Sequence, residues 1–380
     1  MLTVLVSLLV YSVNAHSQTV SFGPVFEAYL TQSIQPKVPG YAVGIVTLDG
    51  TYTISLGVRE IDKPEAFDER TIFRLASISK TFTSAAVIAL QKPSINFDSK
   101  LSSYLPGLVL SNPTYQTQLT LGHILSQSSG LIPHAYTNLI QAGVPYEDII
   151  KKLQDVDFIC EPGSCYSYQN VVYSLAGDAL AQATNSTYEQ LVEQKLFKAL
   201  GMTSSSFGHT PFLEQKNRAA PHRWSKKHKR WQATTPKENY YQLSPSAGIN
   251  TNLIDMIKWL EAQLGRHPEV LNDVHLQNLH APQIKTSRKK SHYGRHSWSG
   301  VSNFGYALGW RTFDFSGEAG FVHHGGWVEG FRVEMVINRR LNIGMFFVTN
   351  SEPGLASDIV PVFIRMYLEH INKQVANNSL

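Results

Sequence analysis

The chain has 380 residues, of which 43% are hydrophobic and 16% are charged, and its formal net charge is only +4. This composition can fill a sizeable core and excludes a disordered chain, while so small a net charge argues against a nucleic-acid-binding protein. The length predicts two lobes rather than one compact core. Two local basic runs, SKKHKR at 225–230 and KTSRKK at 285–290, indicate solvated loops or contact with an anionic surface such as lipid headgroups or cell-wall polymer.

Residues 1–15, MLTVLVSLLVYSVNA, have the character of a secretory signal peptide. They are apolar, carry no charge and end in the small-residue pattern V-N-A. The run is too short to span a bilayer as a mature helix, and no other stretch is a plausible transmembrane helix. We therefore expect an exported protein, periplasmic or secreted, with no transmembrane segment after signal removal. The usual basic residues at the start are missing, which leaves the true first residue open.

The two cysteines, Cys160 and Cys165, stand five apart in CEPGSC. In an exported protein this spacing favours a small disulfide that closes a Pro-Gly turn, and two free structural cysteines are the alternative. Two thiols are too few for a cysteine zinc site, and no histidines with metal-ligand spacing flank them. The sequence predicts neither a bound metal nor another cofactor.

The N-terminal part alternates helical and strand patterns. A helix is expected at 22–37, with one apolar face formed by Phe26, Tyr29, Leu30 and Ile34. Two strand-like runs follow on either side of Asp49-Gly50, a strong hairpin signal. The next helix is expected from Ser77 to about Gln91, and Pro93 marks its end.

The middle of the chain is mostly helical, and strands return near the C-terminus. Helices are expected at 119–127, 146–154, 171–184, 187–200 and 252–264. Strands are expected at 304–313, 319–324, 331–338 and 341–349, and a final amphipathic helix at 355–372. The simplest architecture is one sheet built from both chain ends and covered by terminal helices, with the helical part inserted as a second lobe. A functional site would then lie in the cleft between the lobes.

Ser77 and Lys80 form the first chemically suggestive pair. Side chains at i and i+3 share one face of a helix, so the lysine nitrogen can reach the serine hydroxyl. A desolvated lysine with a lowered pKa can take the proton that makes a serine nucleophilic. The S-x-x-K pattern is weak alone and recurs at Ser287 and Lys290 in a basic loop, but the first copy lies in apolar, helical surroundings.

Two further segments add to this pair. Tyr168 and Asn170 could relay a proton and bind a substrate carbonyl, although Tyr136-Thr137-Asn138 repeats the same spacing. In HHGGWVEGF, at 323–331, the glycines would let a substrate backbone approach a strand, and exposed N–H groups could stabilise an oxyanion. The alternatives are an edge-strand histidine pair with no role or, with less support from the spacing, a metal-binding pair.

In this order the three segments resemble the penicilloyl-serine transferases, the serine β-lactamase and penicillin-binding protein-like family, and specifically its class C β-lactamase and DD-peptidase type. The resemblance covers nearly the whole mature chain. It is carried by FRLASISKTFTS, LTLGHILSQSSGL, EPGSCYSYQNVVYSLAGDAL and YALGW as well as by the glycine segment. It implies an α+β, two-lobed β-lactamase-like fold with an antiparallel sheet, as a single domain over 16–375. The α/β lobe would comprise about 22–93 and 301–375, and the helical lobe about 94–300.

The resemblance also implies roles for individual residues. Ser77 would be the acylated nucleophile, and Lys80 and Tyr168 would share the general-base and general-acid work. Asn170 would orient the substrate. His324, Gly325 and Gly326 would form the third motif, with the register set by Gly330-Phe331, and the backbone N–H groups of Ser77 and Trp327 would form the oxyanion hole.

Three departures from the family pattern bear on the substrate. His324 replaces the lysine common in class C β-lactamases, Gly325 lacks a hydroxyl, and Trp327 is bulky where small residues are common. They argue against efficient β-lactam hydrolysis but leave acyl-serine chemistry intact. A protonated His324 could still attract a carboxylate, in a manner that depends on pH.

The leading hypothesis is an exported serine hydrolase acting on amides or esters through an acyl-enzyme at Ser77. Its substrates would be β-lactams, D-amino-acid peptides such as cell-wall peptides, or small esters. The second hypothesis is a catalytically inactive relative that serves as a cell-wall binding or scaffolding module, and a histidine-dependent metallohydrolase is a third. Motif spacing leaves the choice of substrate and the oligomeric state open.

Overall fold

The computed structural model of the chain describes residues 22–90, 94–287 and 292–378. The predicted signal peptide at 1–15, the helix end at Pro93 and the second motif lysine, Lys290, lie outside the described residues. No helix among those that are described is long and apolar enough to cross a membrane.

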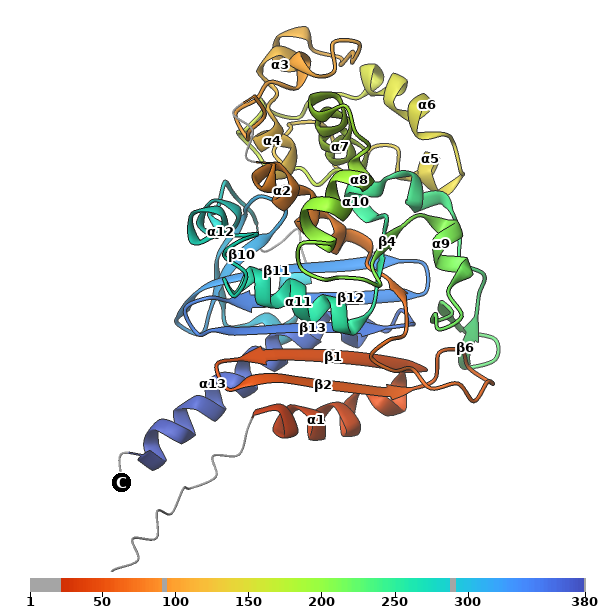
Figure 1. The fold of residues 1–380 in the computed structure, drawn as a ribbon, viewed down its shortest axis with the longest axis vertical. Coiled ribbons are helices and arrows are strands. Elements are labelled where there is room, and N and C mark those ends of the chain that lie inside the picture. Colours follow the sequence, from red (N-terminus) through yellow and green to blue (C-terminus); the bar gives the residue numbers. More distant parts are fainter. Residues whose placement is uncertain (1–21, 91–93, 288–291, 379–380) are drawn as a thin grey trace, which may run out of the picture.

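An eight-stranded antiparallel sheet forms the centre of the molecule (Figure 1). Its strand order is β2-β1-β13-β12-β11-β10-β9-β8, so the two ends of the chain meet where β1 pairs with β13. The strands are β1 (Gly40–Thr47), β2 (Gly50–Gly57), β8 (Ile284–Lys285), β9 (Val301–Tyr306), β10 (Arg311–Phe315), β11 (Glu318–Val328), β12 (Phe331–Asn338) and β13 (Ile343–Thr349). The predicted α+β class, with one sheet built from both ends and flanked by helices, is confirmed.

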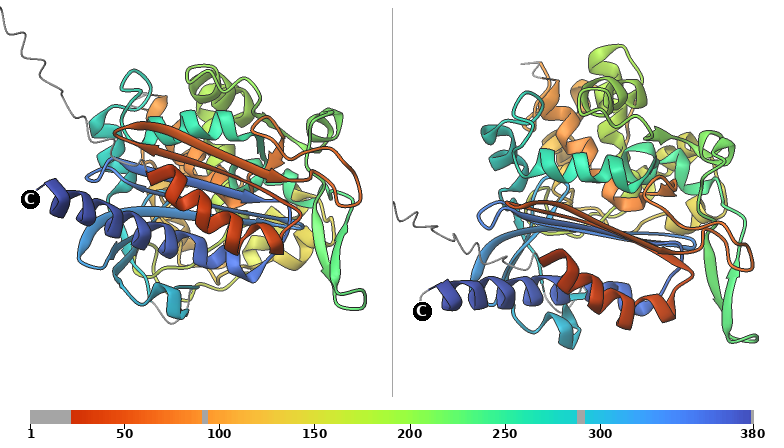
Figure 2. Two further views of the ribbon diagram at one scale, coloured as in Figure 1. Left: turned by 90° about the horizontal axis from the view of Figure 1, so that it is seen from below. Right: turned by 60° about the horizontal axis from the view of Figure 1, so that its bottom comes forward.

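Helices cover both faces of this sheet (Figure 2). The terminal helices α1 (Phe22–Ser33) and α13 (Ile359–Asn378) lie together on one face. On the other face α11 (Leu253–Gln263) runs against β1 and β13. A Cβ at Gly44 of β1 would lie 2.3 Å from Ile257 Cδ1, so a larger residue there would have to displace the Ile257 side chain. The sheet therefore separates two hydrophobic cores, one on each face.

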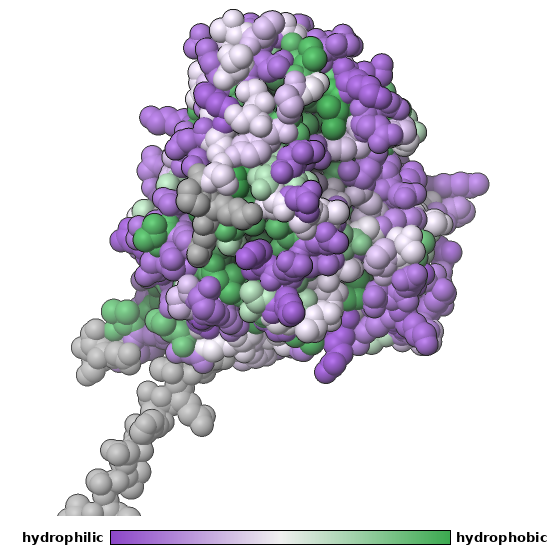
Figure 3. Space-filling view, turned by 45° about the horizontal axis from the view of Figure 1, so that its top comes forward, coloured by the Kyte–Doolittle hydropathy of each residue, from purple (hydrophilic) through white to green (hydrophobic). Residues whose placement is uncertain are grey.

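Most of the remaining described residues form short helices and small sheets on the side of the second face, whereas Tyr293 and Trp298 pack in the core with α1 and α13. The helices are α2 (Ser79–Ala89), α3 (Pro113–Gln118), α4 (Leu121–Leu125), α5 (Thr137–Gln141), α6 (Tyr146–Lys151), α7 (Asn170–Thr184), α8 (Tyr188–Val192), α9 (His209–Glu214), α10 (Ser244–Ala247) and α12 (Asp273–His280). The strands are β3 (Phe73–Arg74), β4 (Ser206–Phe207) and β7 (Ile249–Thr251) in one sheet, and β5 (His222–Ser225) and β6 (Arg230–Ala233) in a separate hairpin. Hydrophilic side chains cover most of the face seen in Figure 3.

Two local predictions near Ser77 and Lys80 differ from the structure, and the strand predicted at 319–324 runs further, from Glu318 to Val328. The run 304–313 is not one strand, because β9 ends at Tyr306 and β10 begins at Arg311. Between them Gly309 has a φ of 78°, and a Cβ there would lie 2.9 Å from the Lys80 carbonyl oxygen, so the chain turns where it touches α2. The helix expected from Ser77 begins at Ser79, and Ser77 lies in a preceding 3-10 turn, Ala76–Ile78.

Helix α2 is held by an aromatic stack with α11. The rings of Phe82 and Trp259 lie 3.8 Å apart between centroids, nearly parallel, and both side chains are fully buried. We expect Phe82→Ala to lower the free energy of unfolding by about 3–5 kcal/mol, because it removes the stack and leaves a cavity. Urea unfolding measures the change. Val274→Ala on α12, where the side chain is 63% exposed, should change stability by less than about 0.5 kcal/mol. Similar values for the two variants would contradict this account of α2.

Candidate active site

A cleft of about 640 Å³ lies between the sheet and the helical part of the chain. Residues from β10, β11 and β12 form one wall, and residues from the helical part form the opposite wall. The lining includes Ser77, His134, Tyr166, Tyr168, Asn170, Tyr240, Arg311, Gly325, Gly326, Trp327, Arg332 and Glu334. Six of the residues singled out from the sequence therefore line one cavity, and Lys80 lies directly behind Ser77.

The backbone places Ser77 at the cleft through an uncommon conformation. The preceding residue, Ala76, is fully buried and has a φ of 50°, in the left-handed region that costs a non-glycine residue about 1–2 kcal/mol. Strand β11 approaches this turn closely, since a Cβ on Gly326 would lie 2.8 Å from the Leu75 carbonyl oxygen and 3.1 Å from the Ala76 Cβ. Packing against β11 thus holds the strained turn that carries Ser77.

Lys80 lies in the first turn of α2 and is completely buried. Its Nζ donates to Asn170 Oδ1 at 2.7 Å and to the Ser246 carbonyl oxygen at 3.0 Å, and lies 3.4 Å from Ser77 Oγ. Burial, together with the positive charge of Arg311, holds the pKa of Lys80 well below its ordinary value. The amine is therefore poised to lose its proton while it stays anchored on two oxygen atoms.

Tyr168 lies next to Ser77 and Lys80, and Asn170 is the first residue of α7. The Lys80 Nζ lies 5.0 Å from the centroid of the Tyr168 ring. Burial raises the pKa of Tyr168 above its ordinary value, and the nearby Ser77 hydroxyl and the charge of Arg311 oppose this only in part. The competing Tyr136 lies elsewhere, where its hydroxyl donates to the Lys152 carbonyl oxygen.

His323 and His324 are both buried, and their rings bond to different partners. His324 Nδ1–H donates to the Gly325 carbonyl oxygen at 2.8 Å, so its Nε2 can accept from the Tyr306 hydroxyl at 3.0 Å. Burial and the charges of Arg311 and Lys80 hold the pKa of His324 well below its ordinary value. The neutral ring predominates at neutral pH, so His324 brings no positive charge to the cleft. His323 instead bonds Glu334 at 2.7 Å, away from Lys80.

Gly325, Gly326 and Trp327 occupy a stretch of β11 that is open on one side. In the described residues β10 pairs with β11 only as far as His323, whereas β12 continues to pair with it through Val328. A Cβ at Gly325 would lie 2.6 Å from a carboxylate oxygen of Glu334, which takes the space of the missing side chain. The Trp327 side chain is 62% exposed, so it lines the cleft without filling it.

Sequence reasoning missed four residues of this site. Arg311 lies over the Tyr168 ring, 5.7 Å from its centroid, and Arg332 donates to Glu334 at 2.8 Å on the same wall of the cleft. The fourth residue, Ser246, offers the carbonyl oxygen that accepts from Lys80. Arg311 directly follows YALGW in the sequence. Pairing the strand that begins there with the strand that contains His323 would have placed Arg311 opposite His323. Ser246 lies 166 residues from Lys80 in the sequence, so no local sequence pattern predicts this contact.

Cys160 and Cys165 form a disulfide with a Cα–Cα distance of 6.3 Å. The bridge closes the turn that precedes Tyr166 and Tyr168, both of which line the cleft. The predicted pairing is thus present, in a segment that leads directly into the site. No group of three or more His, Cys, Asp or Glu side chains in the described part of the chain could hold a metal ion.

Fold and site together define a β-lactamase-like serine hydrolase architecture. A sequence profile of the Beta-lactamase family matches residues 25–361, and the chain belongs to that family. The family resemblance predicted from the sequence is confirmed. The family is one of serine hydrolases.

Individual relatives are distant. Protein flp from Staphylococcus aureus is 24% identical over 352 residues, which cover 90% of this chain and 64% of that protein. Unguisins hydrolase ungD from Aspergillus violaceofuscus is 22% identical over 343 residues, covering 83% of this chain and 59% of that protein. The chain thus spans somewhat less than two thirds of the length of these curated relatives.

A solved structure shares the fold. The octameric penicillin-binding protein homologue from Pyrococcus abyssi superimposes with a TM-score of 0.78 at 20% sequence identity. The match covers 92% of this chain and 78% of that one. At this identity the likeness establishes the architecture.

The close approach of β11 to the Ser77 turn can be tested with glycine variants. A Cβ at Gly326 would meet Val333 Cγ2 at 2.4 Å as well as the Leu75 oxygen. We expect Gly326→Ala to lower the free energy of unfolding by about 1–3 kcal/mol, because overpacking forces β11 and the turn apart. Gly107→Ala is the matched control, since its Cβ would meet nothing within 4 Å. Thermal unfolding compares the two, and an unchanged Gly326→Ala protein would refute the contact.

Proposed function

We propose that the protein is an exported acyl-serine hydrolase that cleaves amide or ester bonds through an acyl-enzyme at Ser77. The observation that carries the proposal is the hydrogen-bond arrangement of Lys80. A neutral amine has two N–H groups and one lone pair. Asn170 Oδ1 and the Ser246 carbonyl oxygen can only accept, so they take the two N–H groups. The lone pair is then left for the Ser77 hydroxyl, 3.4 Å away.

The shifted pKa values of Lys80 and Tyr168 suit the two residues to different proton-transfer steps. Lys80, with its lowered pKa, is suited to accept the Ser77 proton as general base. Tyr168, with its raised pKa, keeps its proton at neutral pH and is suited to act as general acid. Because Tyr168 lies close to Ser77 and its ring lies beside Lys80, we propose that a proton passes between Lys80 and Tyr168 without leaving the site.

The proposed reaction has two halves. Ser77 Oγ bonds to the substrate carbonyl carbon as its proton passes to Lys80, and Tyr168 protonates the leaving nitrogen or oxygen as that bond to carbon breaks. Tyr168 regains its proton from Lys80. Water then attacks the acyl carbon by the reverse route and releases the acid. The backbone N–H groups of Ser77 and Trp327 are proposed to stabilise the oxyanion, which matches the packing of β11 against the serine turn. Asn170 Oδ1 is committed to Lys80, so its Nδ2 amide is the donor it can offer to a substrate.

The charges of the cleft favour substrates that carry a carboxylate. With His324 neutral, the positive charge on the cleft wall comes from Arg311 and Arg332. The Glu334 carboxylate bonds Arg332, which leaves Arg311 as the cation nearer Tyr168. Peptides ending in a D-amino acid, such as cell-wall peptides, and β-lactams have such a carboxylate, whereas simple esters do not. The Aspergillus relative is a hydrolase of unguisins, which is compatible with a hydrolytic role for this chain.

Export is proposed from two features. Residues 1–15 have the composition of a signal peptide, and disulfides such as Cys160–Cys165 persist mainly in oxidising compartments. A periplasmic or extracellular location would also suit cell-wall peptide as a substrate.

Covalent labelling tests the nucleophile. A fluorophosphonate or fluorescent penicillin probe should label the wild-type protein, because both form serine adducts, and Ser77→Ala should abolish the label. Ser287→Ala, at the second S-x-x-K, is the matched control and should label fully. If no probe labels the folded wild-type protein, the alternative of an inactive cell-wall binding or scaffolding relative replaces the hydrolase.

The pH dependence of hydrolysis tests the role of Lys80. With p-nitrophenyl acetate, which has no charge for Arg311 to bind, the rate should rise with pH as Lys80 loses its proton, with an apparent pKa well below that of an ordinary lysine. Arg311→Gln removes a positive charge that depresses the Lys80 pKa, so the rising limb should move to higher pH. Arg332→Gln, which removes another cation of the cleft wall, should leave the limb in place. A rising limb that does not move in Arg311→Gln would argue against Lys80 as the base.

A further inference from the structure

The hairpin formed by β5 and β6 concentrates the positive charge of the chain. Residues 222–233 include five lysines and arginines and no acidic residue. The whole chain has 33 basic and 29 acidic residues, so without the hairpin its formal charge would fall from +4 to −1. The hairpin projects from the body beside the start of β1 and the end of β2, and the structure describes all of it (Figure 2).

Three lysines at the tip, Lys226, Lys227 and Lys229, are exposed and make no ion pair within the described residues. The arginines nearer the body differ, because Arg223 pairs with Glu329 at 3.1 Å and Arg230 with Asp62 at 3.5 Å. The uncompensated charge is therefore at the outermost point of the hairpin, where a flat anionic surface could reach it.

Two tryptophans lie behind these lysines. Trp224 and Trp231 pair across the hairpin and pack edge to face, with ring centroids 5.4 Å apart. Trp231 is fixed because its Nε1 donates to the Lys37 carbonyl oxygen at 2.9 Å, whereas Trp224 is 51% exposed. Such a half-exposed indole beside cations suits the interface of a lipid bilayer, where the ring enters the headgroup region and the charges meet phosphates.

The hairpin is held rigidly at its base. The buried His222 lies between two backbone groups, with Nδ1 bonded to the Asn350 carbonyl oxygen at 2.8 Å and Nε2 accepting from the Ile61 N–H at 2.9 Å. These bonds hold the backbone at the base of the hairpin, so contact with a surface would require little ordering of the backbone there.

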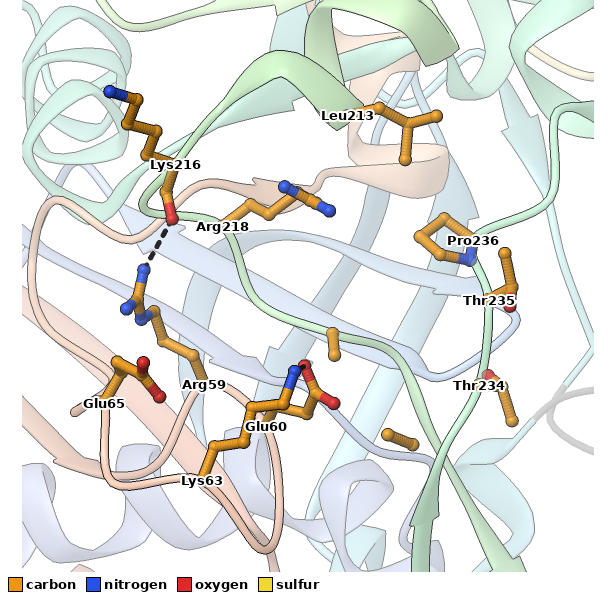
Figure 4. Close-up of a pocket in the computed structure, with 12 residues that line it drawn as sticks. Arg59, Glu60, Lys63, Glu65, Leu213, Lys216, Arg218, Thr234, Thr235 and Pro236 are labelled. Carbon is orange, nitrogen blue, oxygen red and sulfur yellow. Dashed lines mark hydrogen bonds and ion pairs between the residues drawn. The ribbon is translucent and has the colours of Figure 1, made fainter.

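A hollow of about 570 Å³ beside the hairpin base extends the polar, mainly basic surface (Figure 4). Four cationic and two acidic side chains line it: Arg59, Lys63, Lys216 and Arg218, and Glu60 and Glu65. Residues Ala233 and Thr234, at the end of β6, form part of its wall. The region around the hairpin therefore does not offset the charge at its tip.

We propose that the β5–β6 hairpin docks the protein on the surface of an anionic lipid bilayer, with Trp224 inserted at headgroup level and the three tip lysines bound to lipid phosphates. A soluble polyanion would satisfy the lysines equally well but would leave the Trp224 ring in water. The exposed indole is thus the feature that favours lipid over polymer.

Vesicle sedimentation tests the docking. Wild-type protein should bind vesicles of equal parts phosphatidylglycerol and phosphatidylcholine, should not bind phosphatidylcholine alone, and should bind less as salt is raised. Replacing Lys226, Lys227 and Lys229 by Gln together should weaken binding on the order of a hundredfold, from about fivefold per lysine. Trp224→Ser should weaken it too and abolish the blue shift of tryptophan emission on vesicle addition. Absence of binding by the wild-type protein would overturn the proposal.

Two controls separate this hairpin from general surface effects. Lys152→Gln/Lys195→Gln/Lys198→Gln removes the same charge from exposed sites in the helical part, and Leu48→Ser removes a 76% exposed apolar side chain elsewhere. Both should bind vesicles as the wild type does, and equal losses in them would refute docking by the hairpin. If Trp224→Ser binds normally while the triple lysine variant binds neither vesicles nor polyphosphate, the partner is an anionic polymer and the lipid proposal is wrong. Circular dichroism confirms that each variant is folded.

Discussion

The burial of one amine, Lys80, is the constraint around which the site is arranged. A lysine taken out of water is stable only if it loses its charge or finds partners, and here both conditions hold. Desolvation and the nearby Arg311 lower its pKa, while Asn170 and the Ser246 carbonyl oxygen accept its N–H groups. These partners come from α7 and α10, so the helical part must pack over α2 before the Lys80 amine has its two hydrogen-bond acceptors. The same packing forms the cleft.

The sheet contributes the other half of the site through close backbone approach. Gly326 brings β11 against the turn that carries Ser77, and Gly309 brings the β9–β10 connection against α2. Both contacts depend on the pairing of β1 with β13, which joins the two chain ends into one sheet and so brings residue 77 beside residue 326. The strained φ of Ala76 persists because packing on both sides leaves the turn no relaxed alternative.

Family membership and substrate choice rest on different residues. Membership of the Beta-lactamase family rests on a match across residues 25–361, and the acyl transfer proposed for the protein rests on Ser77, Lys80 and Tyr168. The charges of the cleft wall come from other residues: His324 is neutral, the Glu334 carboxylate occupies the space where a side chain at Gly325 would lie, and Arg311 and Arg332 are cationic. Since relatives at 20–24% identity do not identify a substrate, it must be sought from the charges and shape of this wall.

The sequence by itself determined the local chemistry: the Ser77–Lys80 spacing, the Cys160–Cys165 turn, the hairpin at Asp49-Gly50 and, through ordered motifs, the family. These features depend on neighbours along the chain, which local patterns record. Tertiary structure alone decided that Ser77 precedes α2, that 304–313 bends into a hairpin, and that Arg311 rather than His324 carries charge into the cleft. Each of those outcomes depends on burial and on contacts between segments far apart in the sequence, and periodicity contains no information about them.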